Sequence, residues 1–192
     1  MSEAAGPARV DRGPARRYDP DRRQRIIAAC LDVIAERGVA GTSHRRVAAA
    51  ADVPLGSMTY HFAGMAELLQ EAFGAFTGTV AATFERRMAP ATDEESARAA
   101  VVALICDDLL GVDRELVLTH ELYTLAAREE SYRELTNAWM RASRAALERH
   151  FDPATARILD ALIEGLTIHR ALDTVPHDRA LVVDAVERAC AG

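Results

Sequence analysis

Apolar residues recur at intervals of three or four positions along most of this 192-residue chain, and this spacing restricts the fold more than any other feature. Near the N-terminus, for example, Ile26, Ile27, Cys30, Leu31 and Ile34 would all lie on one side of an α-helix. No segment shows the strict alternation of apolar and polar residues that a half-buried strand requires. The sequence therefore predicts an all-α fold of about nine helices.

Breaks in this pattern separate three short N-terminal helices from a series of longer ones. Asp19-Pro20 can cap and open a first helix, and Gly38 can end it in a left-handed conformation. Pro54 separates a second helix, capped by Thr42 or Ser43, from a third. The predicted spans are 19–37, 43–50, 55–62, 65–88, 94–110, 114–127, 131–150, 153–172 and 177–191.

The chain lacks the signatures of several protein classes. No apolar run reaches the roughly 18 residues of a membrane span, and no secretory signal is evident, so we expect a cytoplasmic protein. The three cysteines form no CxxC pair, which argues against a disulfide framework or structural zinc. A Gly-rich phosphate loop, a GxSxG motif and an HExxH motif are all missing. We therefore expect no catalytic residues, metal or cofactor, and an α-helical enzyme is only a remote alternative.

Charge is distributed unevenly along the chain. The net charge is −6, yet residues 1–62 carry ten arginines and seven acids, while residues 63–192 carry thirteen arginines and twenty-two acids. A basic front and an acidic back suggest that only the front meets a polyanion.

The segment 42–62, TSHRRVAAAADVPLGSMTYHF, predicts two short helices joined by a tight turn. Such a pair can place one helix in the major groove of DNA, and a helix beginning at Ser43 offers free amides to a phosphate. Arginine can bridge two acceptors on guanine, while hydroxyl and imidazole groups suit phosphate oxygens. Core positions are expected at Val47, Ala48, Val53, Met58 and Phe62. Outward positions are expected at His44, Arg45, Arg46, Leu55, Ser57, Thr59, Tyr60 and His61.

Residues 21–69 resemble the N-terminal domain of TetR-family transcriptional regulators. The matching positions are Gly38, Thr42, Val47-Ala48, Val53, Gly56 and His61-Phe62. The resemblance implies that the second helix touches phosphates and bases through Ser43, His44 and Arg45. It also implies that the recognition helix carries Leu55, Gly56, Ser57, Thr59, Tyr60 and His61.

Two departures from the family pattern lie in the same region. Thr59 stands where the family usually has Tyr, and Met65 stands where it commonly has a phosphate-anchoring Lys. The fourth-helix phosphate contact is therefore in doubt, although the arginines of the N-terminal arm could compensate. His61 has no acid or second His three or four residues later, which argues against a catalytic or metal-binding role.

The resemblance divides the chain into a disordered arm at 1–18, a helix-turn-helix domain at 19–66 with its motif at 43–62, and a ligand-binding and dimerisation domain at 67–192. Segments such as LGSMTYHF and HFDPATARILDALIEGLTIH are also similar to a subgroup that contains the stationary-phase regulator of biofilm genes in enteric bacteria.

The C-terminal domain is expected to form the dimer seam and a small-molecule pocket. An apolar stripe and the small pair Ala161 and Gly165 permit close helix approach between subunits. The predicted seam residues are Ile158, Ala161, Leu162, Gly165, Leu166, Leu181 and Ala185. The pocket candidates are aromatic, polar or soft side chains on otherwise apolar helices: Phe73, Phe76, Cys106, Glu121, Tyr123, Trp139, Glu164 and His169.

Taken together, these features predict a homodimeric repressor that binds a palindromic double-stranded DNA operator and is released by an unidentified small-molecule effector. In this hypothesis the effector shifts the population toward a state in which the fourth helix, starting at Met65, swings and changes the spacing of the two recognition helices. A transcriptional activator and a ligand-independent regulator are the alternatives, because the sequence does not decide the sign of regulation.

Overall fold

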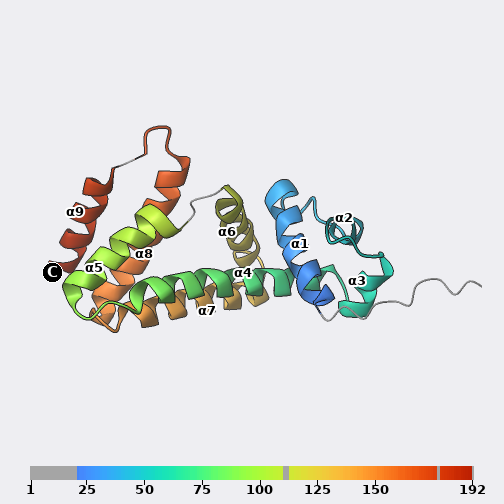
Figure 1. The fold of residues 1–192 in the computed structure, drawn as a ribbon, viewed down its shortest axis with the longest axis horizontal. Helices are drawn as coiled ribbons and strands as arrows, with labels where there is room; N and C mark the ends of the chain where they lie inside the picture. The colour runs from blue at the N-terminus through green and yellow to red at the C-terminus, as the bar shows by residue number, and fades with distance from the viewer. Residues whose placement is uncertain (1–20, 110–112, 177, 192) are drawn as a thin grey trace, which may run out of the picture.

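The computed structural model describes residues 21–109, 113–176 and 178–191, and every regular element in these ranges is a helix (Figure 1). The all-α prediction is thus confirmed, with nine α-helices and one π-helical turn in the described part of the chain. The elements are α1 (Arg22–Arg37), α2 (His44–Ala50), α3 (Gly56–His61), α4 (Met65–Met88), α5 (Glu94–Ala103), η1 (Leu104–Asp108), α6 (Asp113–Ala126), α7 (Glu130–Leu147), α8 (Pro153–Leu172) and α9 (Arg179–Cys190).

The predicted spans of α4 and α8 agree with the structure, whereas several other boundaries differ. In the described part of the chain the first helix begins at Arg22, after an Asp21 whose side chain makes no capping hydrogen bond. The predicted start at Asp19-Pro20 lies outside the described residues. The predicted arm at 1–18 lies outside the described residues. The helix expected over 94–110 changes at Leu104 into a π-helical turn. α9 begins at Arg179 because the Asp178 carboxylate caps it, accepting a hydrogen bond from Leu181 N at 2.9 Å.

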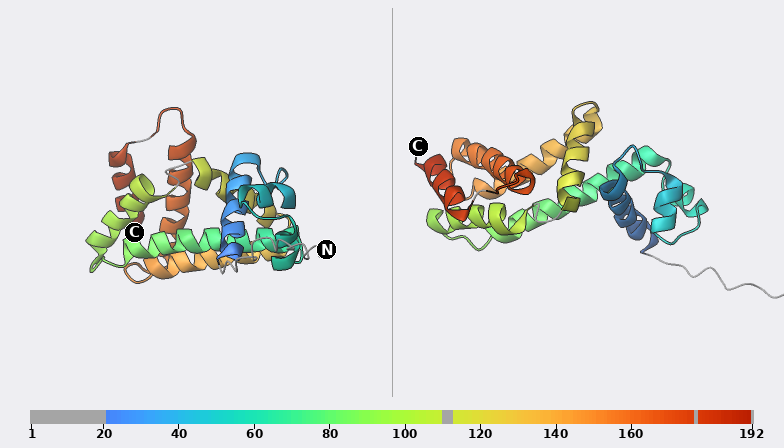
Figure 2. Two further views of the ribbon diagram at one scale, coloured as in Figure 1. Left: turned by 45° about the vertical axis from the view of Figure 1, so that its right-hand side comes forward. Right: turned by 90° about the horizontal axis from the view of Figure 1, so that it is seen from above.

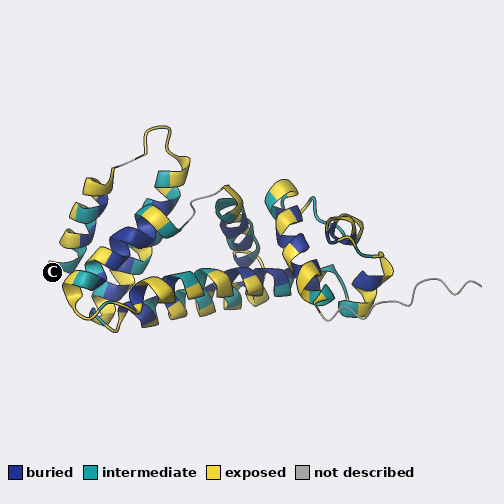
Figure 3. Ribbon diagram, in the orientation of Figure 1, coloured by how far each residue is buried: buried dark blue, intermediate teal, exposed yellow. Residues whose placement is uncertain are grey.

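Two hydrophobic clusters form the core (Figure 3). The first joins α1, α2 and α3 to the N-terminal half of α4, to α6 and to the start of α7. The second joins the C-terminal half of α4 to α5, η1, α8, α9 and the end of α7. The three-helix N-terminal unit therefore shares a core with α4 and α6 and does not form an independent core of its own.

α4 passes through both clusters, and α7 runs beside it in the same direction (Figures 1 and 2). Two contacts define this parallel register. Near the start of both helices, Gln70 Nε2 donates to the carbonyl of Ser131 at 3.0 Å, and near their ends Arg149 pairs with Glu85 at 2.7 Å. Seen from above, α1–α3 lie at one end of this pair and α5, α8 and α9 at the other (Figure 2).

Gly38 ends α1 at the point where α6 meets the N-terminal unit. Its φ of 67° is positive, as expected, but its ψ of 170° lies outside the left-handed helical region and in a region that is almost exclusive to glycine. A Cβ atom at this position would lie 2.6 Å from Glu121 Oε1 of α6. Both the backbone conformation and the close approach therefore require glycine.

We expect Gly38→Ala to destabilise the protein by about 1–3 kcal/mol, because the alanine is strained in this conformation and its methyl group displaces Glu121. Chemical denaturation monitored by circular dichroism measures this change. Gly78→Ala is the matched control, since Gly78 is helical, exposed and has open space around its Cβ position. That variant should be stabilised by about 0.5–1 kcal/mol. Equal effects of both substitutions would contradict the role given to Gly38.

Candidate nucleic-acid interface and effector pocket

The α2–turn–α3 unit is held on α1 by a small apolar core. Val47, Ala48, Met58 and Phe62 are buried as predicted, while Val53 is half-buried. Val53 N donates to the carbonyl of Ala48 at 3.0 Å, which closes the turn between the two helices. This packing leaves the opposite side of α3 free to face a partner.

That free side carries aromatic, polar and aliphatic groups. The Tyr60 side chain is 83% exposed and Leu55 is 54% exposed, and Thr59 is exposed between them in sequence. A shallow depression beside α3 is lined by the start of α2, by α3 and by the start of α4: Thr42, Ser43, His44, Arg45, Leu55, Thr59 and Met65. The structure thus brings five of the ten predicted DNA-contacting residues, Ser43, His44, Arg45, Leu55 and Thr59, to one depression.

The two arginines of α2 are in different situations. The Arg46 guanidinium donates a hydrogen bond to the carbonyl of Gly41, and Arg46 N is capped by the Ser43 hydroxyl at 3.4 Å. Arg45 is exposed and makes no hydrogen bond or ion pair with the part of the chain that the structure describes. Arg45 is therefore the α2 cation that can reach a phosphate or base without breaking an internal contact.

Three of the predicted outward residues do not lie fully outward, and one of them, His61, is half-buried at the end of α3. Ser57 is only 6% exposed, so the expectation that its hydroxyl is available to DNA is wrong. α3 begins at Gly56 and packs so that Ser57 and Met58 are both buried. His44 is half-buried, and its Nε2 atom is enclosed without a hydrogen-bond partner among the described residues. Any contact from His44 to DNA would have to use its other ring nitrogen.

Arginines of α1 fasten this unit in place, a role that the sequence reasoning did not assign. Arg23 lies 5.1 Å from the centroid of the Phe62 ring and forms an ion pair with Glu71 of α4. Arg25 Nε donates to the carbonyl of Ala51 at the end of α2, at 3.1 Å. These contacts join α1 to α2, α3 and α4, so they hold the recognition helix relative to α4.

The first turn of α4 carries no cation. Met65 is half-buried there, and the Glu67 carboxylate accepts a hydrogen bond from Ala63 N at 2.5 Å. No basic side chain of this turn therefore replaces the phosphate-anchoring lysine that the family commonly has at the position of Met65.

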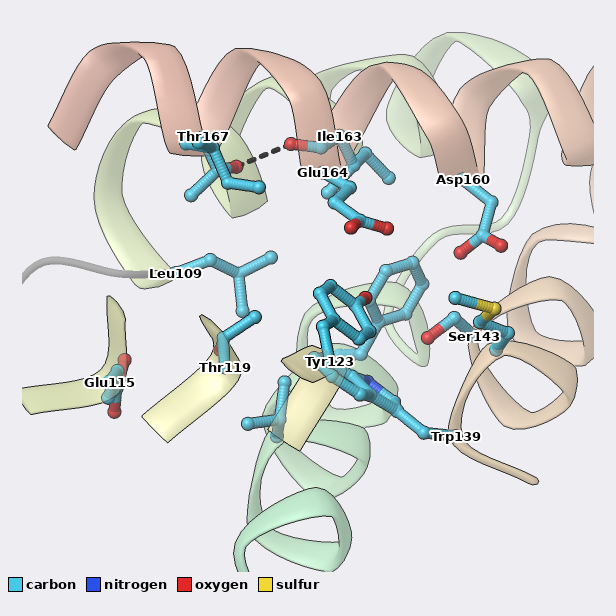
Figure 4. Close-up of a pocket in the computed structure, with 14 residues that line it drawn as sticks. Leu109, Glu115, Thr119, Tyr123, Trp139, Ser143, Asp160, Ile163, Glu164 and Thr167 are labelled. Carbon is cyan, nitrogen blue, oxygen red and sulfur yellow. Dashed lines mark hydrogen bonds between the residues drawn. The ribbon is translucent and has the colours of Figure 1, made fainter. Parts of the chain in front are cut away.

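A second candidate site is a cavity of about 60 Å³ between α4, α6, α7 and α8 (Figure 4). It lies where the two hydrophobic clusters meet. Its lining is Val80, Phe84, Leu109, Glu115, Thr119, Tyr123, Trp139, Met140, Ser143, Asp160, Ile163, Glu164, Thr167 and Ile168.

Aromatic rings form one wall of this cavity. The rings of Tyr123 and Trp139 are stacked, with centroids 6.1 Å apart and planes at 17°. The Phe76 ring also contacts Trp139, edge to face, with the ring centroids 6.2 Å apart and the planes at 70°. A flat aromatic ligand could extend this stack.

Carboxylates line the opposite wall, on α8. Asp160 Oδ2 accepts a hydrogen bond from Arg144 NH1 at 3.2 Å, and both side chains are about 80% buried, being 19% and 20% exposed. Burial raises the pKa of Asp160, although the adjacent Arg144 guanidinium opposes this. Burial, followed by the charge and hydrogen bond of Glu164, raises the pKa of Tyr123, which therefore remains a protonated donor (Figure 4).

Three of the eight pocket candidates line the cavity: Tyr123, Trp139 and Glu164. The other five do not. Phe73 and Phe76 are buried in the first cluster, Cys106 packs against the second, and His169 is exposed on α8. Glu121 points toward α1, where its Oε2 accepts a hydrogen bond from Val39 N at 3.2 Å.

The sequence reasoning missed the polar residues Thr119, Ser143, Asp160 and Thr167. The available signal was their helical spacing from residues that were recognised: Thr119, Ser143 and Asp160 lie four positions from Tyr123, Trp139 and Glu164, and Thr167 lies three positions from Glu164.

Helix α6 belongs to both sites. Thr119 and Tyr123 face the cavity, while Arg114 pairs with Asp32 of α1 at 2.8 Å. The Glu121–Val39 hydrogen bond adds a second contact, from the second half of α6 to the turn that follows α1. α6 is therefore in direct contact with both the cavity and the N-terminal unit.

The predicted seam residues form an incompletely covered surface on α8 and α9. Ile158, Ala161, Gly165 and Leu181 are exposed, and Leu162, Leu166 and Ala185 are half-buried. Ile158 and Leu181 are 53% and 49% exposed, which is unusual for large apolar side chains in two packed helices.

Among the described residues, no helix is long and apolar enough to cross a membrane. The same residues include no group of three or more His, Cys, Asp or Glu side chains arranged to hold a metal ion.

A helix-turn-helix unit joined through long helices to a bundle with an internal cavity defines the class of helical DNA-binding regulators. Residues 26–72 match the family model described as bacterial regulatory proteins of the tetR family. Curated proteins gave no match.

Solved structures place the chain more closely. SCO7518 of Streptomyces coelicolor A3(2), described provisionally as a transcriptional regulator, is 57% identical, with a TM-score of 0.82 over 90% of this chain and 100% of that one. SCO1917 of the same organism, a member of the TetR family, is 33% identical, with a TM-score of 0.75 over 90% and 100%. The multidrug binding protein EbrR in complex with ethidium is 35% identical, with a TM-score of 0.73 over 90% and 99%. The chain belongs to the TetR family of transcriptional regulators.

The contrast between the two α2 arginines can be tested. Arg45→Ala should lower affinity for a specific operator by about 1–3 kcal/mol, because a base contact is lost. Arg46→Ala should lower it less, since that guanidinium already bonds to Gly41. Fluorescence anisotropy with specific and scrambled duplexes measures both. An equal loss of affinity for the two duplexes would make Arg45 a phosphate contact.

Proposed function

We propose that this protein is a homodimeric repressor that binds a palindromic operator and releases it when a small aromatic effector occupies the cavity. The observation that carries this proposal is the position of α6, which lines the cavity with Thr119 and Tyr123 and is bonded to α1 through Arg114 and Glu121.

The dimer is supported by the uncovered apolar surface on α8 and α9. Ile158 of α8 and Leu181 of α9 are exposed, and the small residues Ala161 and Gly165 of α8 are exposed as well, so two copies can approach closely and cover this surface. A two-fold dimer presents two recognition helices to two half-sites, which accounts for a palindromic operator.

An aromatic effector is supported by the lining of the cavity and by a relative. The Tyr123–Trp139 stack offers a flat apolar wall, and polar groups on α7 and α8 can orient a ligand. EbrR has been solved in complex with ethidium, proflavin and malachite green, which are all aromatic compounds. We transfer this effector class to the present protein as part of the proposal.

The small size of the cavity would couple effector binding to a movement of the surrounding helices. Sites for drug-sized ligands enclose roughly 300–1,000 Å³, whereas this cavity has about 60 Å³. An effector of that size must therefore push α6 away from α8. Because α6 holds α1 at two points, the N-terminal unit moves with it, and α4 follows through the shared core. The effector shifts the equilibrium only by the difference in its affinity for the two states.

The same small volume favours a second candidate, a regulator that binds DNA without using an effector. The sign of regulation is a separate matter, because an activator and a repressor can share this architecture and differ in where the operator lies in the promoter.

A gel shift with DNA from the upstream intergenic region of its own gene tests the proposal, with an unrelated duplex as competitor. We expect a specific complex whose affinity falls steeply as the salt concentration rises, because phosphate contacts release counterions. We also expect this complex to dissociate on addition of ethidium or proflavin. A specific complex that no aromatic compound dissociates would favour the effector-independent regulator.

We expect Glu121→Ala to weaken the link between the cavity and the DNA-binding unit while leaving the cavity intact. The variant loses the hydrogen bond to Val39, so the ratio of operator Kd with and without effector should fall about fivefold, which corresponds to about 1 kcal/mol of coupling. Anisotropy titrations at saturating effector measure this ratio.

Glu134→Ala is the control, because Glu134 is an exposed glutamate of α7 that lines neither site. An unchanged ratio in Glu121→Ala would show that α6 transmits nothing through this contact.

A further inference from the structure

The charges around the cavity are not equivalent. Three carboxylates line it, on Glu115, Asp160 and Glu164, and its lining includes no arginine. The cavity wall is therefore acidic, and the three carboxylates differ in whether a cation of the protein already pairs with them.

Asp160 is neutralised from within the protein. Arg144 of α7 reaches it at 3.2 Å, and the pair is mostly buried. A cationic ligand that approached Asp160 would compete with a guanidinium that is already in place, and displacing it would leave a buried charge without a partner.

Glu115 stands apart from the aromatic stack. It lies at the far end of the cavity from Tyr123, with Thr119 between them (Figure 4). A ligand that stacks on Tyr123 and Trp139 therefore lies nearer to Glu164 than to Glu115 (Figure 4).

Glu164 is the remaining carboxylate, and its position is different. It follows Asp160 by one helical turn on the same face of α8, and its carboxylate faces the Tyr123 hydroxyl (Figure 4). It forms no ion pair with any described residue, and a half-buried carboxylate of this kind favours a cation as its partner.

We propose that the effector is an aromatic cation and that Glu164 alone recognises its charge, next to the Tyr123–Trp139 stack. This inference rests on the effector cavity of the proposed function and adds the charge of the ligand and the residue that reads it. The aromatic wall attracts a cationic ring somewhat more than a neutral one, and the Glu164 carboxylate adds the larger attraction that depends on charge. Asp160 contributes to the fold of the wall through Arg144.

The test uses two probes of nearly equal shape, N-methylacridinium and acridine, at a pH at which acridine is neutral. The full-length protein is titrated with each by calorimetry. Emission from Trp139, the only tryptophan in the sequence, reports whether a probe occupies this cavity. Wild type should bind the cation about tenfold or more tightly than the neutral ring, as one half-buried charge pair predicts.

Three variants assign the preference to its source. Glu164→Gln keeps the size of the side chain and should reduce the preference to less than about threefold, through weaker binding of the cation and little change for acridine. Glu164→Asp keeps the charge and should retain most of the preference. Glu134→Gln removes one surface charge and should behave like wild type. Thermal melting confirms that each variant is folded.

The outcomes separate this inference from the proposed function. Persistence of the preference in Glu164→Gln overturns the role of Glu164. Equal binding of both probes by wild type, with quenching of Trp139, overturns the cationic effector but retains an aromatic one. Failure of both probes to quench Trp139, in protein that still binds its operator, overturns the effector cavity itself and this inference with it.

Discussion

The structure depends on the packing of α4 against α7. α4 contributes its first half to the cluster under the DNA-facing unit and its second half to the cluster of the C-terminal bundle. α7 lies parallel to it, held near one end by Gln70 and near the other by Arg149. Because each helix belongs to both clusters, neither cluster can rearrange without a response from the other. The isolated helix-turn-helix would lose the partners that bury its apolar side.

The cavity follows from the same arrangement. The two clusters share α4 and α7 and meet part-way along them. At this junction the packing includes Thr119, Ser143 and Thr167 in place of larger apolar groups. Short polar side chains leave room and supply hydrogen-bonding groups. In the proposed function, a ligand at this junction acts on the separation of the two clusters.

Much of the fold could be predicted from the sequence because the helix ends carry local signals. Asp152-Pro153 opens α8 where expected, and the Asp152 carboxylate caps the helix through Ala154 N at 2.9 Å. The π-helical turn could not be predicted, since a shift of backbone hydrogen bonding from four to five residues has no residue signature.

The cavity could be predicted only in part, for a geometric reason. Tyr123 and Glu121 are both polar or aromatic residues on an otherwise apolar helix, yet they are two positions apart and so lie on different sides of α6. Which side faces the cavity depends on how α6 packs against α1 and α8, and that is decided by long-range contacts. The same reasoning applies to Ser57, whose side is set by the packing of a six-residue helix.

The π-helical turn at Leu104–Asp108 has a consequence for how this protein can change over evolutionary time. The turn accommodates one more residue than an α-helical turn would, and it is tied down on both sides, by Arg87 to Asp108 and by Arg179 to Asp107. Leu109, the next residue, lines the cavity. Deletion of a single residue here would restore α-helical winding and rotate the following side chain by about 100°, away from its present direction. A change of chain length at this turn can therefore reshape the cavity while the four helices that surround it keep their sequences.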